Sequence, residues 1–266
     1  AVAEATGLDR LVEAVRGRLA AVPEPGDLAE RAAAAMAKRP RRSLRAALSA
    51  DGPSVIAECK KASPSAGLLR AEFDPVRLAA RYQAAGASAI SVVTEPDFFQ
   101  GRLEWLPAVR EVVDLPVLRK DFIVDERQLR EAAVAGADAV LLIQRILTVD
   151  RLAELVGAAQ DLGLETLVEI FSDEEPGPTV ASGTAIIGVN ARDLATFVTR
   201  LDVVEKMAGE LPTDRVRVAE SGIQGPADIL RLQAAGYDAF LIGEHLVRAD
   251  DPERALQRLR FGDDEG

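Results

Sequence analysis

The sequence predicts an α/β protein built as a single closed (β/α)₈ barrel with an N-terminal helical extension, and three observations lead to this. The chain has 266 residues, 48% hydrophobic and 28% charged, which suits one such barrel. A glycine-containing corner followed by a short apolar run recurs, as in Ala135-Gly136-Ala137 before Val140 to Ile143. Helical patterns fill the intervals, so the repeating unit is helix, glycine corner and buried parallel strand.

The extension comprises residues 1–50, and residues 51–266 form the barrel in this prediction. Apolar spacing indicates helices over 8–20, 28–36 and 44–48. Their arginine-rich faces predict a cap or layer packed over one mouth of the barrel.

The strands of the barrel are short apolar runs bounded by glycine or polar residues, as expected for strands buried on both faces. An open doubly wound sheet is the alternative, but it often carries a glycine-rich dinucleotide turn after its first strand. Here that strand runs into Lys60-Lys61-Ala62-Ser63-Pro64 instead. The eight predicted strands cover residues 54–60, 88–94, 116–121, 139–144, 166–170, 185–190, 216–221 and 239–243.

Helices between the strands begin and end at recognisable signals. Asp74-Pro75 supplies a cap and a first-turn proline, and Leu78 and Tyr82 follow at helical spacing. In the segment 173–181, Pro176-Gly177-Pro178 interrupts the pattern, which predicts a short or broken helix. The remaining helices are predicted over 126–135, 149–162, 201–208, 226–235 and, as a short turn, 244–247.

Composition excludes several classes of function. The formal charge of −11 argues against a nucleic-acid partner, which needs a basic face. Cys59 and His245 are the single cysteine and histidine, so a thiolate cluster, a multi-histidine metal site and a Ser-His-Asp triad are disfavoured. No apolar run approaches the roughly 20 residues of a membrane span, and the N-terminus is too acidic for a signal peptide. We expect a cytoplasmic protein with no membrane partner.

Polar side chains gather where the predicted strands end, which is where barrels of this kind place their chemistry. Alternation along the strands directs Glu58 and Lys60 one way and Cys59 the other, and directs Lys120 into the barrel. The opposite strand ends are alanine, glycine and apolar residues, whereas independent surface charges would scatter over both ends. The candidate site residues are Glu58, Lys60, Lys120, Glu169, Asn190, Arg192, Glu220 and Ser221.

Two glycine corners predict a phosphate site. Ser221-Gly222 follows the seventh strand, and Gly243-Glu244 lies between the eighth strand and a helical turn. Glycine lets the backbone approach closely, and backbone N–H groups at such a corner can hold a dianion. We expect the phosphate on Gly222, Gly243 and Glu244.

Long motifs in a fixed order carry a resemblance to a known family. They are Ile56 to Ser65, Thr94-Glu95-Pro96 with Phe98 to Gly101, Leu118 to Ile123, Leu167 to Glu169, Gly188 to Leu194 and Ala219 to Ile223. Over about 55–260 the sequence resembles indole-3-glycerol-phosphate synthase, the carboxy-lyase of tryptophan biosynthesis. Two departures are the prolines of the fifth helix and Glu244, where some members have serine.

The resemblance implies a reaction and roles for individual residues. The substrate would be the phosphorylated small molecule 1-(2-carboxyphenylamino)-1-deoxyribulose 5-phosphate, whose pyrrole ring closes with loss of CO₂ and water; no metal, organic cofactor or obligate protein partner is implied. Lys120 would be the general acid and Glu169 the general base. Lys60 would contact anionic groups, Glu58 would orient a lysine or bind a hydroxyl, and Ser63 would help hold the phosphate. Asn190, Arg192, Glu220 and Ser221 would position the sugar and carboxylate, and Pro64, Phe99, Phe122, Leu141, Ile143 and Leu194 would form the aromatic slot.

Two further expectations complete the sequence-based prediction. The connection over 61–73 is long for its place and predicts a mobile lid that closes on substrate. A different phosphosugar barrel enzyme, such as an isomerase, and a non-catalytic barrel are the competing functions. The Glu-x-Lys, Lys-Asp-Phe and Asn-x-Arg set favours the synthase.

Overall fold

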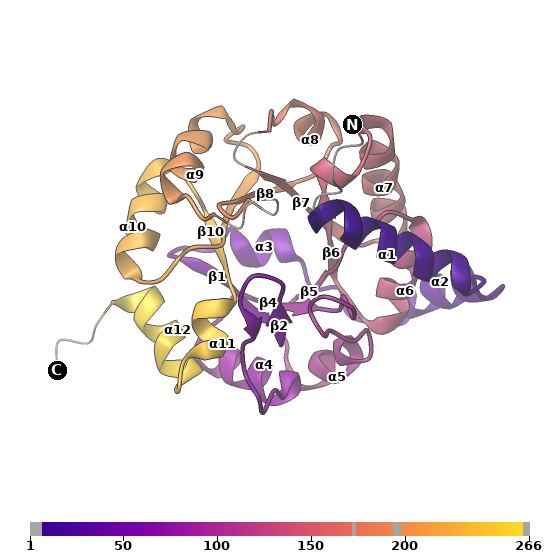
Figure 1. Ribbon diagram of the computed structural model, residues 1–266, viewed down its shortest axis with the longest axis horizontal. Coiled ribbons are helices and arrows are strands. Elements are labelled where there is room, and N and C mark those ends of the chain that lie inside the picture. Colours follow the sequence, from indigo (N-terminus) through magenta and orange to yellow (C-terminus); the bar gives the residue numbers. More distant parts are fainter. Residues whose placement is uncertain (1–6, 172–173, 194–197, 263–266) are drawn as a thin grey trace.

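The described residues of the computed structural model, 7–171, 174–193 and 198–262, form a closed barrel of eight parallel strands surrounded by helices (Figure 1). This confirms the predicted barrel, and each strand lies within one residue of its predicted bounds at either end. The barrel strands are β1 (Ser54–Cys59), β4 (Ala89–Val93), β5 (Val117–Lys120), β6 (Ala139–Ile143), β7 (Glu165–Phe171), β8 (Ile186–Asn190), β9 (Val216–Glu220) and β10 (Ala239–Ile242).

The helices follow the predicted caps, with two additions. Asp74 accepts hydrogen bonds from the N–H groups of Val76 and Arg77, as its place before Pro75 predicts. Sequence reasoning missed α5 and α12, although Asp251-Pro252 repeats the same start signal. The helices around the barrel are α4 (Pro75–Ala84), α5 (Trp105–Val112), α6 (Glu126–Ala135), α7 (Val149–Leu162), α8 (Gly177–Ala181), α9 (Leu201–Met207), α10 (Pro226–Ala235), α11 (Glu244–Arg248) and α12 (Pro252–Phe261).

The N-terminal helices α1 (Gly7–Ala21), α2 (Leu28–Lys38) and α3 (Leu44–Leu48) reach both ends of the barrel. Helix α1 crosses the end where the strands finish (Figure 1), and α2 packs against α6 and α7 on the outside. Helix α3 inserts two fully buried leucines at the end where the strands begin. The prediction of a cap over one mouth therefore describes only part of the extension, because its helices contact both mouths.

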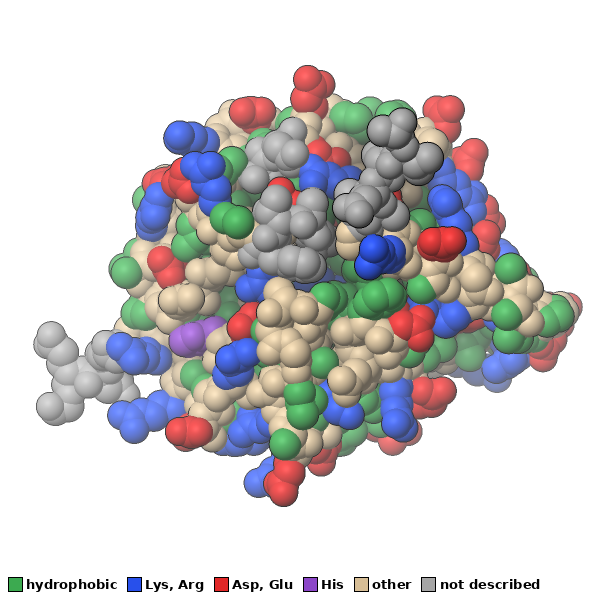
Figure 2. Space-filling view, in the orientation of Figure 1, with side chains coloured by type: hydrophobic (Ala, Val, Ile, Leu, Met, Phe, Trp, Pro, Cys, Tyr) green, Lys and Arg blue, Asp and Glu red, His purple; other side chains and the backbone are tan. Residues whose placement is uncertain are grey.

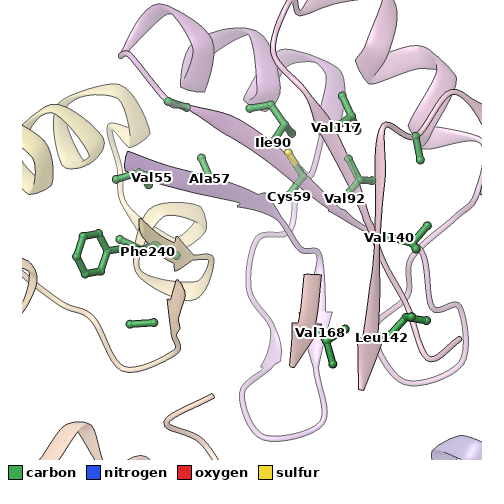
Figure 3. Packing of buried hydrophobic residues seen from close by; sticks show 14 of the residues in the cluster. Val55, Ala57, Cys59, Ile90, Val92, Val117, Val140, Leu142, Val168 and Phe240 are labelled. Atoms are coloured by element: carbon green, nitrogen blue, oxygen red, sulfur yellow. The ribbon is translucent and has the colours of Figure 1, made fainter. Parts of the chain in front are cut away.

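Side chains of the strands alternate between two apolar layers. Val55, Ala57 and Cys59 of β1 point outward and pack under the helices (Figure 3), whereas Ile56 and Glu58 point into the barrel. Burial raises the pKa of the Cys59 thiol far above its ordinary value, so this cysteine is a buried packing residue, as its alternation predicts.

After three of the glycine corners, the residue before the new strand makes hydrogen bonds to the preceding strand. The Val117 N–H donates to Asp138 Oδ2 at 2.9 Å, and the Asp138 N–H donates to the Val117 carbonyl at 2.8 Å. Arg217 and Asp238 make the same pair of bonds, and Ser88 takes the corresponding place after the first corner. The repeated corner therefore encodes a strand-to-strand clamp as well as a turn.

Replacing Asp138 with Ala should lower the free energy of unfolding by about 1–3 kcal/mol. The change leaves the Val117 N–H without its buried acceptor and leaves the Arg110 guanidinium without its ion-pair partner. Denaturant unfolding of purified variants would measure the loss. Asp238→Ala is the matched control, because the Asp238 side chain is 39% exposed against 3% for Asp138 and should cost less. Equal losses for the two variants would contradict this.

Within the described ranges, no helix is both long enough and apolar enough to span a membrane.

Candidate active site

Two cavities of different character meet at the end of the barrel where the strands finish. One lies beneath α1, has a volume of about 210 Å³, and has a wall whose exposed surface is mostly apolar. The other has a volume of about 610 Å³ and is lined by the loops after β9 and β10. Charged side chains of both signs surround this face of the molecule (Figure 2). The residues shared by the two cavities are Glu58, Lys60, Lys120, Arg192 and Ser221.

Glu58 joins the two lysines at the junction of the cavities. Its carboxylate lies 3.2 Å from Lys120 Nζ and 3.4 Å from Lys60 Nζ, and it accepts a hydrogen bond from Ser91 Oγ at 3.1 Å. Gly243 faces this carboxylate, and a Cβ at that position would lie 2.6 Å from Glu58 Oε1. The buried Glu58 therefore fixes two ammonium groups that come from different strand ends.

Burial and charge pull the pKa values of these groups in opposite directions. Burial would raise the pKa of Glu58, but Lys120 and Lys60 outweigh it and hold that pKa below its usual range. Burial lowers the pKa of Lys60, and although Glu58 opposes this, the repulsion from Lys120 and Arg192 helps to keep that pKa below its ordinary value. Burial also opposes the charge on Lys120, but Glu58, Glu220 and Glu169 raise its pKa above the ordinary lysine value. Lys120 therefore holds its proton more tightly than Lys60 does.

The backbone around Lys120 is held by a buried network on the outer side of β5. Arg119, 5% exposed, donates to Asp121 Oδ2 at 3.0 Å and to the Gln128 carbonyl at 2.7 Å. Gln128 in turn donates to the carbonyl of Phe122 at 2.9 Å. The residues on either side of Lys120 are thus fixed by hydrogen bonds, which orients its side chain toward the cavities.

Glu169 and Glu220 face each other across β8. Oxygens of both carboxylates are buried without a hydrogen-bond donor among the described residues, and Lys120 Nζ lies 3.8 Å from Glu220 Oε2. Gly188 of β8 makes this approach possible, because a Cβ there would collide with Glu220 Oε1. Burial and the charge of Glu169 raise the pKa of Glu220 well above its ordinary value. A proton on Glu220 would give these buried oxygens a hydrogen bond between the two carboxyl groups.

The smaller cavity brings together most of the predicted aromatic slot. The rings of Phe99 and Phe122 lie with centroids 5.9 Å apart, and Leu141 and Ile143 of β6 form the floor. Pro64 and Ser63 line the same cavity from the loop after β1, and Asn190 and Glu169 line it from β8 and β7. Leu194, the last predicted member, lies outside the described residues.

The larger cavity contains the predicted phosphate corner. Gly222 and Gly243 line it, together with Ser221 and Glu244. Ser221 has φ of 68° and Gly222 has φ of 78°, so two consecutive residues adopt left-handed backbone at the end of β9. A non-glycine residue in this conformation is a strained position of the kind found at functional sites.

The predicted lid, residues 61–73, lines the smaller cavity with Ser63, Pro64 and Ser65. It contains a short hairpin of β2 (Ala62–Ser63) and β3 (Gly67–Leu68) that sequence reasoning did not anticipate. Arg192 Nη1 donates to Ser65 Oγ at 3.3 Å, and Arg248 Nη2 donates to the Ala66 carbonyl at 3.3 Å. At the far end of the lid, the ring of Phe73 packs on Trp105 with centroids 5.1 Å apart. A few side-chain contacts therefore hold this segment in place.

Amide hydrogen exchange in 61–73 should slow when the site is filled, because a ligand bound beneath the segment would add contacts that stabilise its closed position. Exchange measured by mass spectrometry with and without the product of the synthase that the sequence resembles would test this. Helix α10, none of whose residues lines either cavity, serves as the internal control. Unchanged exchange in 61–73 at saturating ligand would contradict the lid.

Several lining residues were missed by sequence reasoning. Gly7, Arg10 and Leu11 of α1 line the smaller cavity, and Arg248 and His245 of α11 line the larger one. Helix α1 is held in place by Arg18, which pairs with Glu95 at 3.2 Å after β4. The amphipathic pattern of α1 could identify its buried face but not its location above the barrel. Arg248 could have been found from its position one turn after Glu244.

Comparisons with known proteins were made for the whole chain. The family model described as indole-3-glycerol phosphate synthase matches residues 8–259. A protein of that name from Rhodococcus opacus is 46% identical over 96% of this chain and 94% of its own length. One from Geobacillus thermodenitrificans is 46% identical over 92% of this chain and 90% of its own.

Solved structures share the fold at low sequence identity. A thiamine phosphate pyrophosphorylase from Pyrococcus furiosus covers 82% of this chain and 96% of its own, with a TM-score of 0.59 and 18% identity. A 3-hexulose-6-phosphate synthase from Salmonella typhimurium covers 77% and 96%, with a TM-score of 0.63 and 16% identity. At this identity the likeness concerns the barrel alone.

Proposed function

Because this chain belongs to the indole-3-glycerol phosphate synthase family and has the activity of that carboxy-lyase, we propose how its own residues perform the reaction. The substrate is 1-(2-carboxyphenylamino)-1-deoxyribulose 5-phosphate. Its aromatic ring occupies the smaller, apolar cavity, and its phosphate occupies the larger one. The ketone between them then lies beside Lys120. The observation that carries this placement is that an apolar and a polar cavity meet at that lysine.

Lys120 acts first, as the general acid. The ring carbon that bears the carboxylate attacks the ketone carbon, and the ketone oxygen takes a proton from the Lys120 ammonium as the new C–C bond forms. The raised pKa of Lys120 supports this role, because it ensures that the proton is present at neutral pH. Glu58 holds the ammonium by its 3.2 Å contact and orients it toward the cavity.

Loss of CO₂ then restores the aromatic ring. The C–CO₂ bond breaks, and its electron pair returns to the ring system, which the bond-forming step had left electron-deficient. The apolar walls formed by Phe99, Phe122 and Leu141 favour this step, because they disfavour the charged carboxylate and not the neutral CO₂.

Glu169 acts last, as the general base. It removes a proton from the ring carbon next to the nitrogen, while the hydroxyl on the adjacent carbon leaves as water with a proton from a lysine of the Lys60–Lys120 pair. The position of Glu169 supports this assignment, because its buried carboxyl group lines the smaller cavity. Asn190 accepts the Arg192 N–H at 2.9 Å and positions the loop that contacts the sugar.

Backbone N–H groups of Gly222, Gly243 and Glu244 hold the phosphate in this scheme, with Ser63 contributing from the lid. The test is to incubate the protein with the carboxyphenylamino-deoxyribulose phosphate and follow the fluorescence of the indole product. Product should appear in proportion to enzyme. No signal at high enzyme concentration would contradict the assigned reaction.

A further inference from the structure

The side chain of Glu244 places a carboxylate inside the larger cavity among its cations. Glu244 Oε2 lies 3.2 Å from Arg192 Nη2, and Oε1 lies 3.5 Å from Arg248 Nε. Lys60 and Lys120, the other cations at the shared centre, pair with Glu58 instead. Of the three arginines among the described residues that line this cavity, Glu244 therefore pairs with two, Arg192 and Arg248.

A phosphate group held on the backbone corner of this cavity would also attract the same guanidinium groups. Phosphate oxygens accept hydrogen bonds from a guanidinium in the geometry that a carboxylate uses, and arginine is the usual partner of both. The two anions would repel each other if both were held between Arg192 and Arg248. The Glu244 side chain is 31% exposed, so it has a path into solvent when a stronger anion takes its place.

We propose that the Glu244 carboxylate is an internal counter-anion that occupies Arg192 and Arg248 in the free enzyme and lowers the affinity for the phosphate of the ligand. This inference rests on the proposed location of the phosphate. Glu244 thereby sets specificity: a ligand whose aromatic part also binds in the apolar cavity displaces the carboxylate, whereas inorganic phosphate alone competes poorly. The backbone of Glu244 and its side chain then have opposite effects on phosphate binding.

A purely structural role for Glu244 predicts the opposite sign. If the carboxylate only held Arg192 and Arg248 in position for the phosphate, its removal would disorder both side chains and weaken binding. The sign of the change in affinity therefore separates the two roles.

The test is Glu244→Gln, which keeps the shape of the side chain and removes its charge. Dissociation constants are measured by calorimetry for indole-3-glycerol phosphate, for phosphate-free indole-3-glycerol and for inorganic phosphate. The two phosphate ligands should bind about 5-fold more tightly, the factor for one unit charge about 4 Å away in water. Phosphate-free indole-3-glycerol should bind as it does to the unmodified enzyme.

The outcomes separate this inference from the phosphate location on which it rests. Phosphate affinity that is unchanged or weaker in Glu244→Gln, or a gain shared by phosphate-free indole-3-glycerol, would overturn the counter-anion role. Arg248→Met is the second variant and should weaken the two phosphate ligands alone. If both variants leave the dissociation constants of the two phosphate ligands unchanged relative to that of phosphate-free indole-3-glycerol, the phosphate binds elsewhere. In that case the proposed location of the phosphate is wrong. Circular dichroism of each variant checks that it is folded.

Discussion

Lys120→Met should lower kcat by about 10²–10⁴-fold, the usual contribution of a positioned general acid. Methionine fills a similar volume but has no proton to donate to the ketone oxygen and no charge to stabilise it. It also removes one of the two cations that hold the pKa of Glu58 below its usual range. Steady-state rates of indole formation would measure the loss, with circular dichroism to confirm the fold.

Lys38→Met is the matched control for that variant. Lys38 is exposed near the end of α2 and lines neither cavity, so the same substitution there should leave the rate close to that of the unmodified enzyme. A Lys120→Met variant with a rate within a factor of ten of the original would refute the general-acid role.

Glu169→Gln should also lower kcat by about 10²–10⁴-fold, and the loss should fall on the final step. The amide keeps the size of the side chain but cannot accept the ring proton, so dehydration stalls after decarboxylation. In a single turnover with substrate carrying a labelled carboxylate, CO₂ should be released well before indole fluorescence rises. Simultaneous appearance of the two products, or a nearly normal rate, would contradict the assignment.

Glu220→Gln provides the comparison for Glu169→Gln. Burial and Glu169 already favour the neutral form of Glu220, so an amide at that position changes the charge of the site little. Its effect on kcat should be clearly smaller than that of Glu169→Gln. A larger effect for Glu220→Gln than for Glu169→Gln would indicate that Glu220, and not Glu169, is the general base.

The barrel could be predicted from local signals because each unit repeats the same chemistry. Glycine corners such as Gly136 and Gly163 end helices in left-handed backbone, and the apolar run that follows has few alternatives to a buried strand. Strict alternation then placed Lys120 inside the barrel and Arg119 outside, as observed. Helix α5 was missed because its core-facing residues, Leu106 and Val109, form a short pattern interrupted by Pro107.

The geometry of the site depended on contacts between distant segments, which no local pattern contains. Glu169 and Glu220 belong to strands that are not neighbours, and they meet because Gly188 between them has no side chain. The sequence located the polar strand ends but not which carboxyl groups would face each other. Likewise, the position of Glu244 was recognised through its backbone, whereas its side-chain pairs with Arg192 and Arg248 emerge only in three dimensions.

The contact between Phe73 and Trp105 gives the enzyme a spectroscopic probe of its own. Trp105 is the single tryptophan of the chain, and its ring packs on the residue that ends the 61–73 segment. Any displacement of that segment changes the surroundings of one defined chromophore, so stopped-flow emission could time the movement without an attached dye. The same chromophore absorbs where the reaction product does, and a Trp105→Phe background would separate the two signals.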